Sequence, residues 1–572
     1  MKNFDSSKRI FVTGAAGFVG RHVCKQLIDS GFDVRALVRR PYPELIQLGV
    51  KLWISDLWDE DVLREALSGV NVIIHCAGNA RFGNGPHYRL ENVELTKHLT
   101  QAVRQHALTG ARFVYVSTIG AIDRAKSDRC EMPLTEDSAA FPTSDYGKSK
   151  LQAEEVVRHS MLPFVIIRPT MVVGDDMRFD SHFSVFARQA LTVSFVARLA
   201  WPGRFSVIHI DDLASAILTV ATHPNAIGHT YFCAGEATSI ADFFRRCNSE
   251  KMRISLSLIP GAAKHFVKWM PFALKAMLLP ALTASDEKLR ALGWMPRYSA
   301  MSALEEVINR EKSRLDPDIS PGGQSVITGA ASGLGRALAM YLSPRRDHLL
   351  LIDKNGAALE ELASSLGNCT ISVVDLSNEG QVDTLLTSSK WHALNITELY
   401  VCAGIGLRGC MQDISIDNHR KMFAINVLAR IALAKKAISS MQKRHFGRVV
   451  LISSSSAFQP LPYMATYAAT NSALLSIGES WGAEVANDGI QILTVCPGGM
   501  QTNFQKSGGV KVIDGEKLMM PDEVVVKIFR GLRQQRKTLM VSFRSFAMSI
   551  LARCLPRRLS VRLWYRLMEN MR

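Results

Sequence analysis

Short apolar runs alternate along the chain with longer segments in which apolar residues recur at helical spacing. Near the N-terminus, the run RIFV leads into the glycine-rich stretch TGAAGFVG at residues 13–20, and an amphipathic segment follows. This order is typical of a buried strand, a tight turn and a helix that covers the strand. Because the alternation continues along the chain, it predicts an α/β architecture in which helices cover both faces of a parallel sheet.

The same landmarks occur twice, in the same order. Three pairs of segments correspond: TGAAGFVG with TGAASGLG at residues 328–335, IIHCAG at 73–78 with LYVCAG at 399–404, and FVYVST at 113–118 with VVLISSSS at 449–456. Such a long internal repeat indicates two homologous units and not an array of short repeats. We therefore predict two tandem Rossmann-fold domains, each a doubly wound parallel sheet.

A change in composition separates the two halves of the 572-residue chain. The stretch LDPDISPGGQ gathers Pro, Asp, Ser and Gly between a charged helical segment and the second glycine-rich turn. We predict a first domain with a substrate lobe over residues 1–313, a linker over 314–322, a second domain over 323–540 and a basic tail over 541–572.

Composition narrows the classes of protein. Hydrophobic residues make up 47% of the chain and charged residues 21%, as in a globular protein with a sizeable core. The ten cysteines are scattered without CxxC pairs or Cys/His clusters, so we expect neither disulfides nor a metal site, and a reducing, cytoplasmic location. We expect no signal peptide, because the N-terminus runs directly into a strand-like segment, and no spanning helix, because no sufficiently long apolar stretch occurs.

The formal net charge of +16 requires an anionic partner. We expect no nucleic acid, because no nucleic-acid motif is present, and an anionic cofactor or the inner face of a membrane fits better. Residues 542–572 carry leucines on one helical stripe and arginines beside them: Leu559, Leu563 and Leu567, with Arg558, Arg562 and Arg566. Such a helix, kinked or started by Pro556, suits a membrane plane with Trp564 and Tyr565 near the headgroups. Packing on its own domain or in a homo-oligomer is the alternative.

Each glycine-rich turn predicts a dinucleotide site, since a pyrophosphate needs backbone N–H groups at a closely approached helix N-terminus. The residue after the second strand then selects the cofactor. Arg39 and Arg40 stand there in the first unit and suit a 2′-phosphate, so NADP is predicted. Asp353 stands there in the second and favours NAD, with NADP left open because Lys354 follows.

Two further aspartates end the next strand of each unit. Asp56 follows the first domain's third apolar run, and Asp375 stands at the corresponding place in the second. Each of them either faces the adenine of the nucleotide or caps the helix that comes next.

Tyr146 and Lys150 lie four residues apart in SDYGKSK, on one face of a predicted helix. A free phenol has a pKa of about 10, and an ammonium one turn away favours the phenolate and can hold the nicotinamide ribose. A hydroxyl at the end of a strand, Ser117 or Thr118, would bind the substrate oxygen where charge develops. These residues predict proton transfer at a carbonyl or carbinol.

On these motifs, residues 1–310 resemble the extended branch of the short-chain dehydrogenase/reductase superfamily, which is epimerase/dehydratase- or 3-beta-hydroxysteroid-dehydrogenase-like. Further matches are Asn92 in ENVELT, Arg168-Pro169 in IIRPTMVVG, and VIHIDDLA. The resemblance implies Tyr146 as acid/base, Lys150 as its electrostatic partner and Thr118 as the hydroxyl. It also implies a set of cofactor-binding residues around the first turn: Gly14, Gly17, Gly20, Arg39, Arg40, Asp56, Ala77, Gly78 and Lys150.

The resemblance also bears on the reaction. Ile119-Gly120 stands where sugar dehydratases of this branch carry Asp-Glu, and Arg39 argues against an epimerase that retains NAD. The apolar, basic segment at residues 266–282 resembles members that act on hydrophobic ketones or alcohols. We therefore predict hydride transfer between nicotinamide and a lipid-, steroid- or polyketide-like substrate. A nucleotide-sugar epimerase or reductase, and a cofactor-binding scaffold or redox sensor, remain alternatives.

Residues 322–540 resemble the core-only branch of the same superfamily. Ser454 lies 13 residues before Tyr467, at the family's usual spacing. The resemblance implies that Ser454 and Tyr467 are catalytic and that Asn426 relays protons. It implies a second set of cofactor-binding residues: Gly329, Gly333, Gly335, Asp353, Asp375, Ala403, Gly404, Asn471, Pro497, Gly498 and Thr502.

This second unit departs from the family pattern at Asn471, where the pattern has a lysine. An amide can bind a ribose hydroxyl, but it cannot lower the pKa of Tyr467 by charge, an effect worth about one to three units. Three roles stay open for the second domain. It is a cofactor-binding pseudoenzyme, a slow or altered oxidoreductase in which another cation compensates, or the site of unrelated chemistry.

Overall fold

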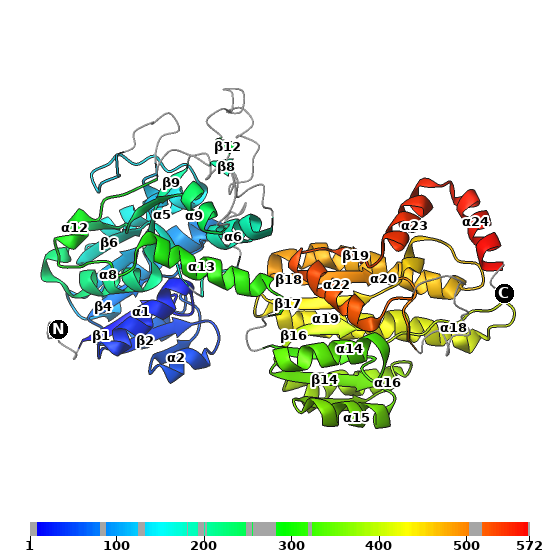
Figure 1. Ribbon diagram of the computed structural model, residues 1–572. Coiled ribbons are helices and arrows are strands. Elements are labelled where there is room, and N and C mark those ends of the chain that lie inside the picture. Colours follow the sequence, from blue (N-terminus) through cyan, green and yellow to red (C-terminus); the bar gives the residue numbers. More distant parts are fainter. Residues whose placement is uncertain are drawn as a thin grey trace. The chain divides into compact units, whose positions relative to one another are not determined.

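The computed structural model describes residues 8–80, 87–123, 132–174, 176–179, 181–192, 199–200, 203–247, 254–255, 282–318, 323–502 and 518–569 (Figure 1). The chain divides into two compact units, Met1–Arg310 and Glu311–Arg572. The division falls inside helix α13 (Ala300–Leu315), upstream of the predicted linker at 314–322. The described start of that linker, residues 314–318, therefore belongs to the second unit.

A seven-stranded sheet forms the centre of the first unit, in the order β10-β6-β5-β4-β1-β2-β3. Its strands are β1 (Arg9–Thr13), β2 (Asp33–Val38), β3 (Lys51–Ile54), β4 (Val72–His75), β5 (Arg112–Val116), β6 (Phe164–Pro169) and β10 (Thr230–Cys233). All six pairings are parallel. The strand order reverses between β1 and β4, which is where doubly wound sheets bind ligands at their carboxyl ends.

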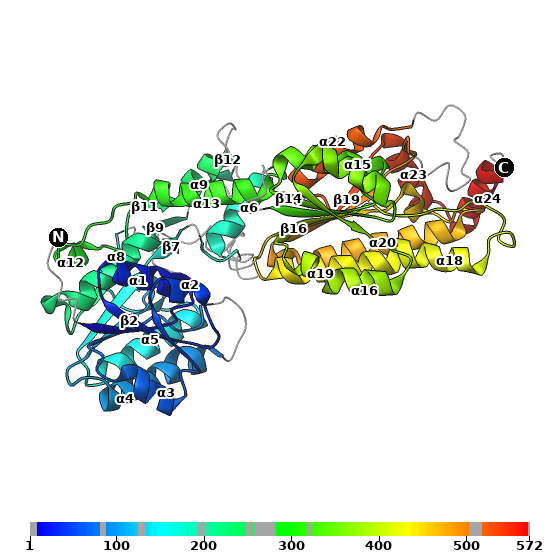
Figure 2. The same cartoon turned by 90° about the horizontal axis from the view of Figure 1, so that it is seen from below.

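Helices cover both faces of this sheet (Figure 2). One face packs against α1 (Phe18–Asp29), α2 (Pro43–Gln47) and α8 (Ile210–Thr222), which bury an apolar stripe of residues such as Val23, Leu27 and Leu213. The other face packs against α3 (Glu60–Leu67), α4 (Leu95–His106) and α5 (Asp145–Arg158). The predicted doubly wound architecture of the first unit is confirmed.

A smaller lobe continues from the carboxyl end of the sheet. Its strands are β7 (Met171–Val173), β9 (Arg204–His209) and β11 (Ala237–Ser239) in one sheet, with β8 (Leu199–Ala200) and β12 (Ile254–Ser255) in another. Phenylalanines from α6 (His182–Thr192), β9 and α9 (Ile240–Cys247) fill its core: Phe183, Phe186, Phe205, Phe243 and Phe244. The short helix α12 (Glu287–Arg290) and the first part of the longer helix α13 also belong to this unit. Most of the apolar segment at 266–282 lies outside the described residues.

The second unit repeats the first sheet's order, β15-β14-β13-β16-β17-β18-β19, with parallel pairings throughout. Its strands are β13 (Gln324–Thr328), β14 (His348–Asp353), β15 (Cys369–Val373), β16 (Ile396–Val401), β17 (Gly447–Ile452), β18 (Ile490–Cys496) and β19 (Thr538–Met540). Two tandem Rossmann-type domains are thus confirmed.

Helices again cover both faces of the second sheet. On one side lie α14 (Gly333–Leu342), α15 (Gly356–Leu366) and α22 (Pro521–Arg533). On the other lie α16 (Glu379–Thr387), α19 (Arg430–Gln442) and α20 (Ala465–Glu484). Two shorter helices lie in the chain between α16 and α19: α17 (Ser389–His392) precedes β16, and α18 (Ile416–Phe423) follows it.

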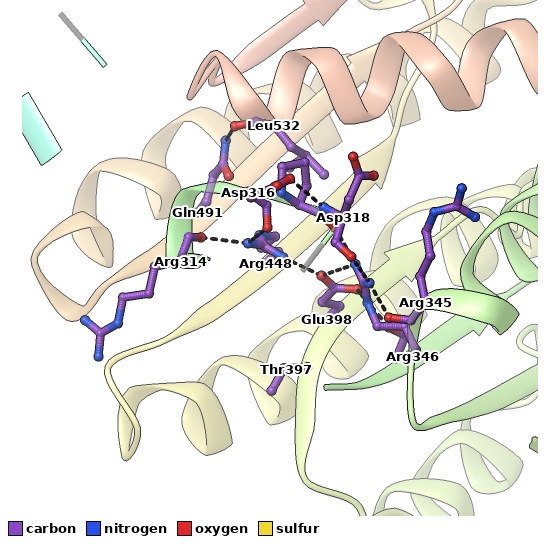
Figure 3. Close-up of polar contacts among 12 residues, drawn as sticks. Arg314, Asp316, Asp318, Arg345, Arg346, Thr397, Glu398, Arg448, Gln491 and Leu532 are labelled. Carbon is purple, nitrogen blue, oxygen red and sulfur yellow. Dashed lines mark hydrogen bonds and ion pairs between the residues drawn. The ribbon is translucent and has the colours of Figure 1, made fainter. Parts of the chain in front are cut away.

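A buried ion cluster fastens the start of the second unit to its sheet (Figure 3). Glu398 of β16 pairs with Arg346 at 2.8 Å and with Arg448 at 2.7 Å, and all three side chains are buried. The same two arginines donate hydrogen bonds to backbone carbonyls within residues 314–318. The segment that the sequence predicts as a linker is thereby held, where it is described, by long-range contacts.

The C-terminal tail forms α23 (Phe543–Cys554) and α24 (Arg557–Glu569), and Pro556 directly precedes the second helix, as predicted. Trp564 and Met568 of α24 pack in one apolar cluster with Tyr463 and Tyr467 of their own domain. Trp564 is thus partly buried against its own domain, while the leucine stripe stays exposed, and contact of this helix with a membrane stays a prediction. None of the helices in the described ranges is long and apolar enough to cross a bilayer.

Candidate active sites

The first glycine-rich turn packs too closely for side chains. Gly14 has a φ of +69°, and a Cβ there would lie 2.7 Å from the backbone nitrogen of Ala77. A Cβ on Gly20 would collide with the backbone of Gly14. Gly17 is the N-cap of α1 and brings no side-chain acceptor to the helix start. The N–H groups of this helix end fit a pyrophosphate, which is the chemistry expected of a dinucleotide cradle.

The second turn has the same geometry. Gly329 has a φ of +68°, and a Cβ there would lie 2.8 Å from the backbone nitrogen of Ala403. A Cβ on Gly335 would collide with the backbone of Gly329. A Cβ on Gly333 would lie 3.1 Å from the side chain of Thr502, so the turn that begins at Pro497-Gly498 reaches the glycine cradle. The residues present fit a dinucleotide in this domain as well.

The strand ends that are expected to select the cofactor differ between the domains. Arg39 and Arg40 directly follow β2 and are exposed, and Arg40 donates hydrogen bonds to the Tyr42 hydroxyl at 3.2 and 3.1 Å. Asp353 ends β14 and accepts a 3.2 Å hydrogen bond from the backbone of Ala331 in the glycine turn. A cationic surface borders the first cradle, whereas a carboxylate borders the second.

The two further aspartates do not cap helices. Asp56 accepts a hydrogen bond from Trp58 N, and Asp375 accepts bonds from the backbone N and the hydroxyl of Ser377. The caps are instead Asp59 for α3 and Asn378 for α16. The helix-cap alternative is therefore wrong for both aspartates, and the adenine-facing role stays a prediction.

Tyr146 is the second residue of α5, and Thr118 follows β5. Burial raises the pKa of Tyr146 to about 12, while the hydrogen bond from Thr118 acts in the opposite direction. The other candidate hydroxyl, Ser117, donates a 2.5 Å hydrogen bond to buried Glu154. Of the two hydroxyls, the structure brings Thr118 to the tyrosine.

Lys150 lies one helical turn from Tyr146 but directs its charge elsewhere. Its ammonium donates a 2.7 Å hydrogen bond to the carbonyl of Val116 and lies 4.2 Å from the ring centroid of Tyr115. Burial lowers the pKa of Lys150 to about 8. The expected lowering of the Tyr146 pKa by this lysine is not found. The groups that act on this pKa are burial first, then Thr118 and Tyr88.

Asn92 connects the strand end after β4 to the tyrosine helix. It lies on a π-helical turn, η1 (Arg89–Glu94), and its Oδ1 accepts a 2.7 Å hydrogen bond from Asn79 N. Its Nδ2 donates to the hydroxyl of Ser149 at 2.9 Å, and that hydroxyl donates to the Tyr146 carbonyl at 2.7 Å. The asparagine thus holds the helix that carries Tyr146 against the loop after β4.

The second domain reproduces this connection. Asn426 lies on a π-helical turn, η7 (Ala424–Ala429), and its Oδ1 accepts a 3.0 Å hydrogen bond from Ile405 N. Its Nδ2 donates to the Thr470 hydroxyl at 3.1 Å, and that hydroxyl donates to the carbonyl of Tyr467 at 2.9 Å. Ser454 hydrogen-bonds the Tyr467 side chain. Three predicted residues, Asn426, Ser454 and Tyr467, therefore come together.

Asn471 and Arg430 distinguish the second site. The amide of Asn471 donates a 2.8 Å hydrogen bond to the backbone carbonyl of Tyr467. Arg430, which the sequence reasoning missed, is buried beside the tyrosine and donates to the carbonyls of Ala403 and Ile452. The sequence does contain one indication of this role: Arg430 lies four residues after Asn426, which places both side chains on one helical face.

Both halves match known families over these sites. The NAD dependent epimerase/dehydratase family model matches residues 10–234, and the short chain dehydrogenase model matches residues 324–510. The "Dehydrogenase/reductase SDR family member 7B" of Bos taurus is 31% identical over 213 residues, covering 35% of this chain and 65% of that one. "Glycine betaine reductase ATRR" of Emericella nidulans is 23% identical over 620 residues, covering 92% of this chain and 48% of that one.

Solved structures resemble each half separately. The UDP-glucuronic acid 4-epimerase of Bacillus cereus has a TM-score of 0.43 at 23% identity, covering 53% of this chain and 99% of that one. A short-chain dehydrogenase from Sphingobium yanoikuyae in complex with NADPH has a TM-score of 0.36 at 21% identity, covering 41% of this chain and 96% of that one. Among the curated relatives, the chain spans 65% of the bovine protein and 48% of the fungal one.

Proposed function

The chain is a fusion of two domains of the short-chain dehydrogenase/reductase type, and on this premise we propose that its N-terminal half is an NADP-linked oxidoreductase of hydrophobic ketones or alcohols. One observation carries the proposal: the hydroxyls of Tyr146 and Thr118 meet beside a buried lysine, at the carboxyl edge that also holds the glycine cradle. A bound nicotinamide would supply or accept the hydride at this edge.

The residues of the chain supply binding and the proton. The turn from Gly14 to Gly20 holds the pyrophosphate, and Arg39 and Arg40 hold the 2′-phosphate. Thr118 and Tyr146 hold the substrate oxygen, and the proton moves at the Tyr146 Oη. Because burial raises the pKa of Tyr146 to about 12, the phenol is protonated near neutral pH and is ready to protonate a carbonyl oxygen. We propose that this site works in the direction of reduction.

The proposed substrate class is supported by the apolar side chains next to Thr118. Ile119, which stands where sugar dehydratases carry an acid, is buried among apolar side chains. A relative aligned with 92% of this chain is named a glycine betaine reductase, which supports the reductive direction for both halves. Turnover of lipid-like ketones by the full chain with NADPH tests the proposal, and turnover of nucleotide sugars alone would contradict it.

The cofactor assignment makes a prediction about NADPH binding. Changing Arg39→Ser together with Arg40→Ser is expected to weaken NADPH binding at the first site about 10- to 100-fold, since hydrogen bonds to charged groups contribute about 1.5–3 kcal/mol. Calorimetric titration of the full chain would show weaker NADPH binding at the first site and unchanged NADH binding. The matched control is Arg64→Ser with Arg104→Ser, which removes two exposed arginines of the same domain. An unchanged NADPH titration would contradict the assignment.

For the tail, we propose contact of α24 with an anionic membrane surface. Its leucines at 559, 563 and 567 are 51%, 36% and 42% exposed, beside the arginines of the same helix. Each basic residue near such a surface contributes about 1 kcal/mol, so Arg558→Gln with Arg562→Gln should weaken binding to phosphatidylglycerol-containing vesicles about 30-fold. Vesicle sedimentation measures this, with Lys435→Gln and Lys443→Gln as control. Equal binding of both variants would contradict the proposal.

A further inference from the structure

The carbonyl that Lys150 binds in the first domain has an equivalent in the second. Val116 ends β5, and Ile452 ends β17, which holds the corresponding place in the second sheet. The next residue of each strand end, Ser117 or Ser453, donates its N–H to the neighbouring strand at 2.8 Å. The two carbonyls therefore occupy the same position relative to the tyrosine helix.

Different side chains reach these two carbonyls. In the first domain the Lys150 ammonium donates to Val116 O at 2.7 Å. In the second, the Arg430 guanidinium donates to Ile452 O at 2.5 Å. Lys150 comes from the tyrosine helix, whereas Arg430 is the first residue of α19. A cation thus binds the same backbone atom from a different helix.

The exchange is paired. Asn471 occupies the lysine position in the second domain, four residues after Tyr467. Thr96 occupies the arginine position in the first domain, four residues after Asn92, and its short side chain donates back to the Asn92 carbonyl at 2.6 Å. Each domain therefore has one long cation and one short polar residue at these two positions, with their places reversed.

The arginine is costly to bury, which argues against a merely structural role. Arg430 is 4% exposed, and its Nε also donates to the carbonyl of Ala403 at 3.0 Å. A Cβ on Gly404 would collide with the guanidinium, so this glycine makes room for it. Taking a cation out of water costs several kcal/mol, which neutral carbonyls offset only in part. Burial lowers the pKa of Arg430 to about 10, so it remains charged near neutral pH.

We propose that the C-terminal domain is a second working oxidoreductase site, in which Arg430 takes the place of the missing lysine. This rests on the proposed function for the type of reaction. A carbonyl substrate gains a hydride at carbon from a reduced nicotinamide and a proton at oxygen from Tyr467 Oη. The guanidinium stabilises the phenolate that remains. Arg430 is a positioning residue, because it acts through the tyrosine.

The groups around Tyr467 agree with this assignment. Burial raises the pKa of Tyr467, and the Ser454 hydrogen bond, the Arg430 charge and the Asn471 hydrogen bond lower it, in that order. Cys496 acts weakly in the raising direction. Trp564 of α24 packs in the same apolar cluster and brings no charge. Among these groups, Arg430 is the one whose charge favours the phenolate.

The experiment uses the full chain carrying Tyr146→Phe, so that the first site is silent. The first quantity is the rate at which NADPH or NADH reduces nonanal and 4-nitrobenzaldehyde. The second is the pKa of Tyr467, taken from the ultraviolet difference spectrum between each variant and the same variant carrying Tyr467→Phe. Arg430→Thr is expected to raise the Tyr467 pKa by about one to three units and to slow reduction about 10- to 1,000-fold. Adding Asn471→Lys to Arg430→Thr recreates the first domain's pair and should restore the rate of reduction.

Each outcome decides the proposal. Asn471→Lys with Arg430 intact should give no gain, because two cations would compete for the Ile452 carbonyl; a tenfold gain overturns the proposal. An unchanged Tyr467 pKa in folded Arg430→Thr overturns it, as does aldehyde reduction that survives Tyr467→Phe. If Arg430→Thr does not fold, Arg430→Lys must keep the tyrosine pKa and the rate. Loss of lipid-ketone turnover in Tyr146→Phe alone tests the first site separately.

Discussion

Tyr146→Phe is expected to reduce turnover at the N-terminal site by a factor of about 10² to 10⁴, the range typical for removal of a general acid. The phenol is the group that can protonate a substrate oxygen held by Thr118, and phenylalanine keeps the ring while removing the proton. The change should leave nucleotide binding intact, because the glycine cradle lies on β1 and α1 and not on α5.

The measurement is NADPH consumption with a lipid-like ketone, in a chain that carries Tyr467→Phe so that the second site does not contribute. Tyr231→Phe is the matched control, since Tyr231 is a buried tyrosine of the same domain whose hydroxyl donates to the Asn225 carbonyl. Turnover within threefold of the parent in Tyr146→Phe, with Tyr231→Phe equally active, would remove Tyr146 from the mechanism.

The sequence predicts the two sheets and the two glycine turns well because local chemistry determines them. Gly14 and Gly329 both adopt positive φ at a backbone approach that a side chain would block. Such positions can be recognised from a few consecutive residues and from the apolar runs beside them. The pairing of Tyr146 with Thr118 follows in the same way, because Tyr146 lies at the start of a helix and Thr118 lies just after a strand.

The direction of the buried charges cannot be read from the sequence in this way. The spacing of Tyr146 and Lys150 predicts a shared helical face, but the ammonium binds Val116 O and the Tyr115 ring. Likewise the spacing of Tyr467 and Asn471 shows a missing lysine, but not that Arg430 from another helix reaches the equivalent carbonyl. Which long side chain reaches a given atom depends on how helices pack, and the sequence around each residue does not encode that packing.

The contacts of residues 314–318 show the same limit. A Pro-, Gly- and Ser-rich stretch predicts a linker at 314–322, and the domain bounds that follow from it stay predictions. The described part of the stretch is held by Arg346 and Arg448, which contact it in space but lie 29 and 132 residues away from their partners in the sequence. Contacts of this range leave no local pattern.

Glu398→Gln is expected to destabilise the second unit by about 3–5 kcal/mol, because it leaves two buried arginines without their anion. Arg346 and Arg448 are 0% and 2% exposed, and both bind Glu398 (Figure 3). These arginines also hold the backbone of residues 314–318, so that segment should become open to proteolysis in the variant. Urea unfolding, followed through the fluorescence of buried Trp391 and of Trp481 in the second unit's core, measures the loss.

The pH dependence of this stability has a definite sign. Burial acts to raise the pKa of Glu398, but the charges of Arg448 and Arg346 outweigh it and hold the pKa below its usual range. A carboxylate with a lowered folded-state pKa contributes stability above its unfolded pKa and loses that contribution as the pH falls through the folded value. The parent should therefore lose stability relative to Glu398→Gln in acid, and the two unfolding curves should approach each other.

Glu361→Gln is the matched control for the same measurement. Glu361 pairs with Arg336 at 3.0 Å, but its side chain is 71% exposed, so water screens the pair. Its loss should change the stability by no more than about 1 kcal/mol. If Glu398→Gln and Glu361→Gln lower the urea midpoint equally, the buried cluster does not hold the second unit together. If the Glu398→Gln and parent midpoints are separate above the unfolded pKa of the carboxyl and converge as the pH falls through its lowered folded value, the charge on Glu398 and not its shape is responsible.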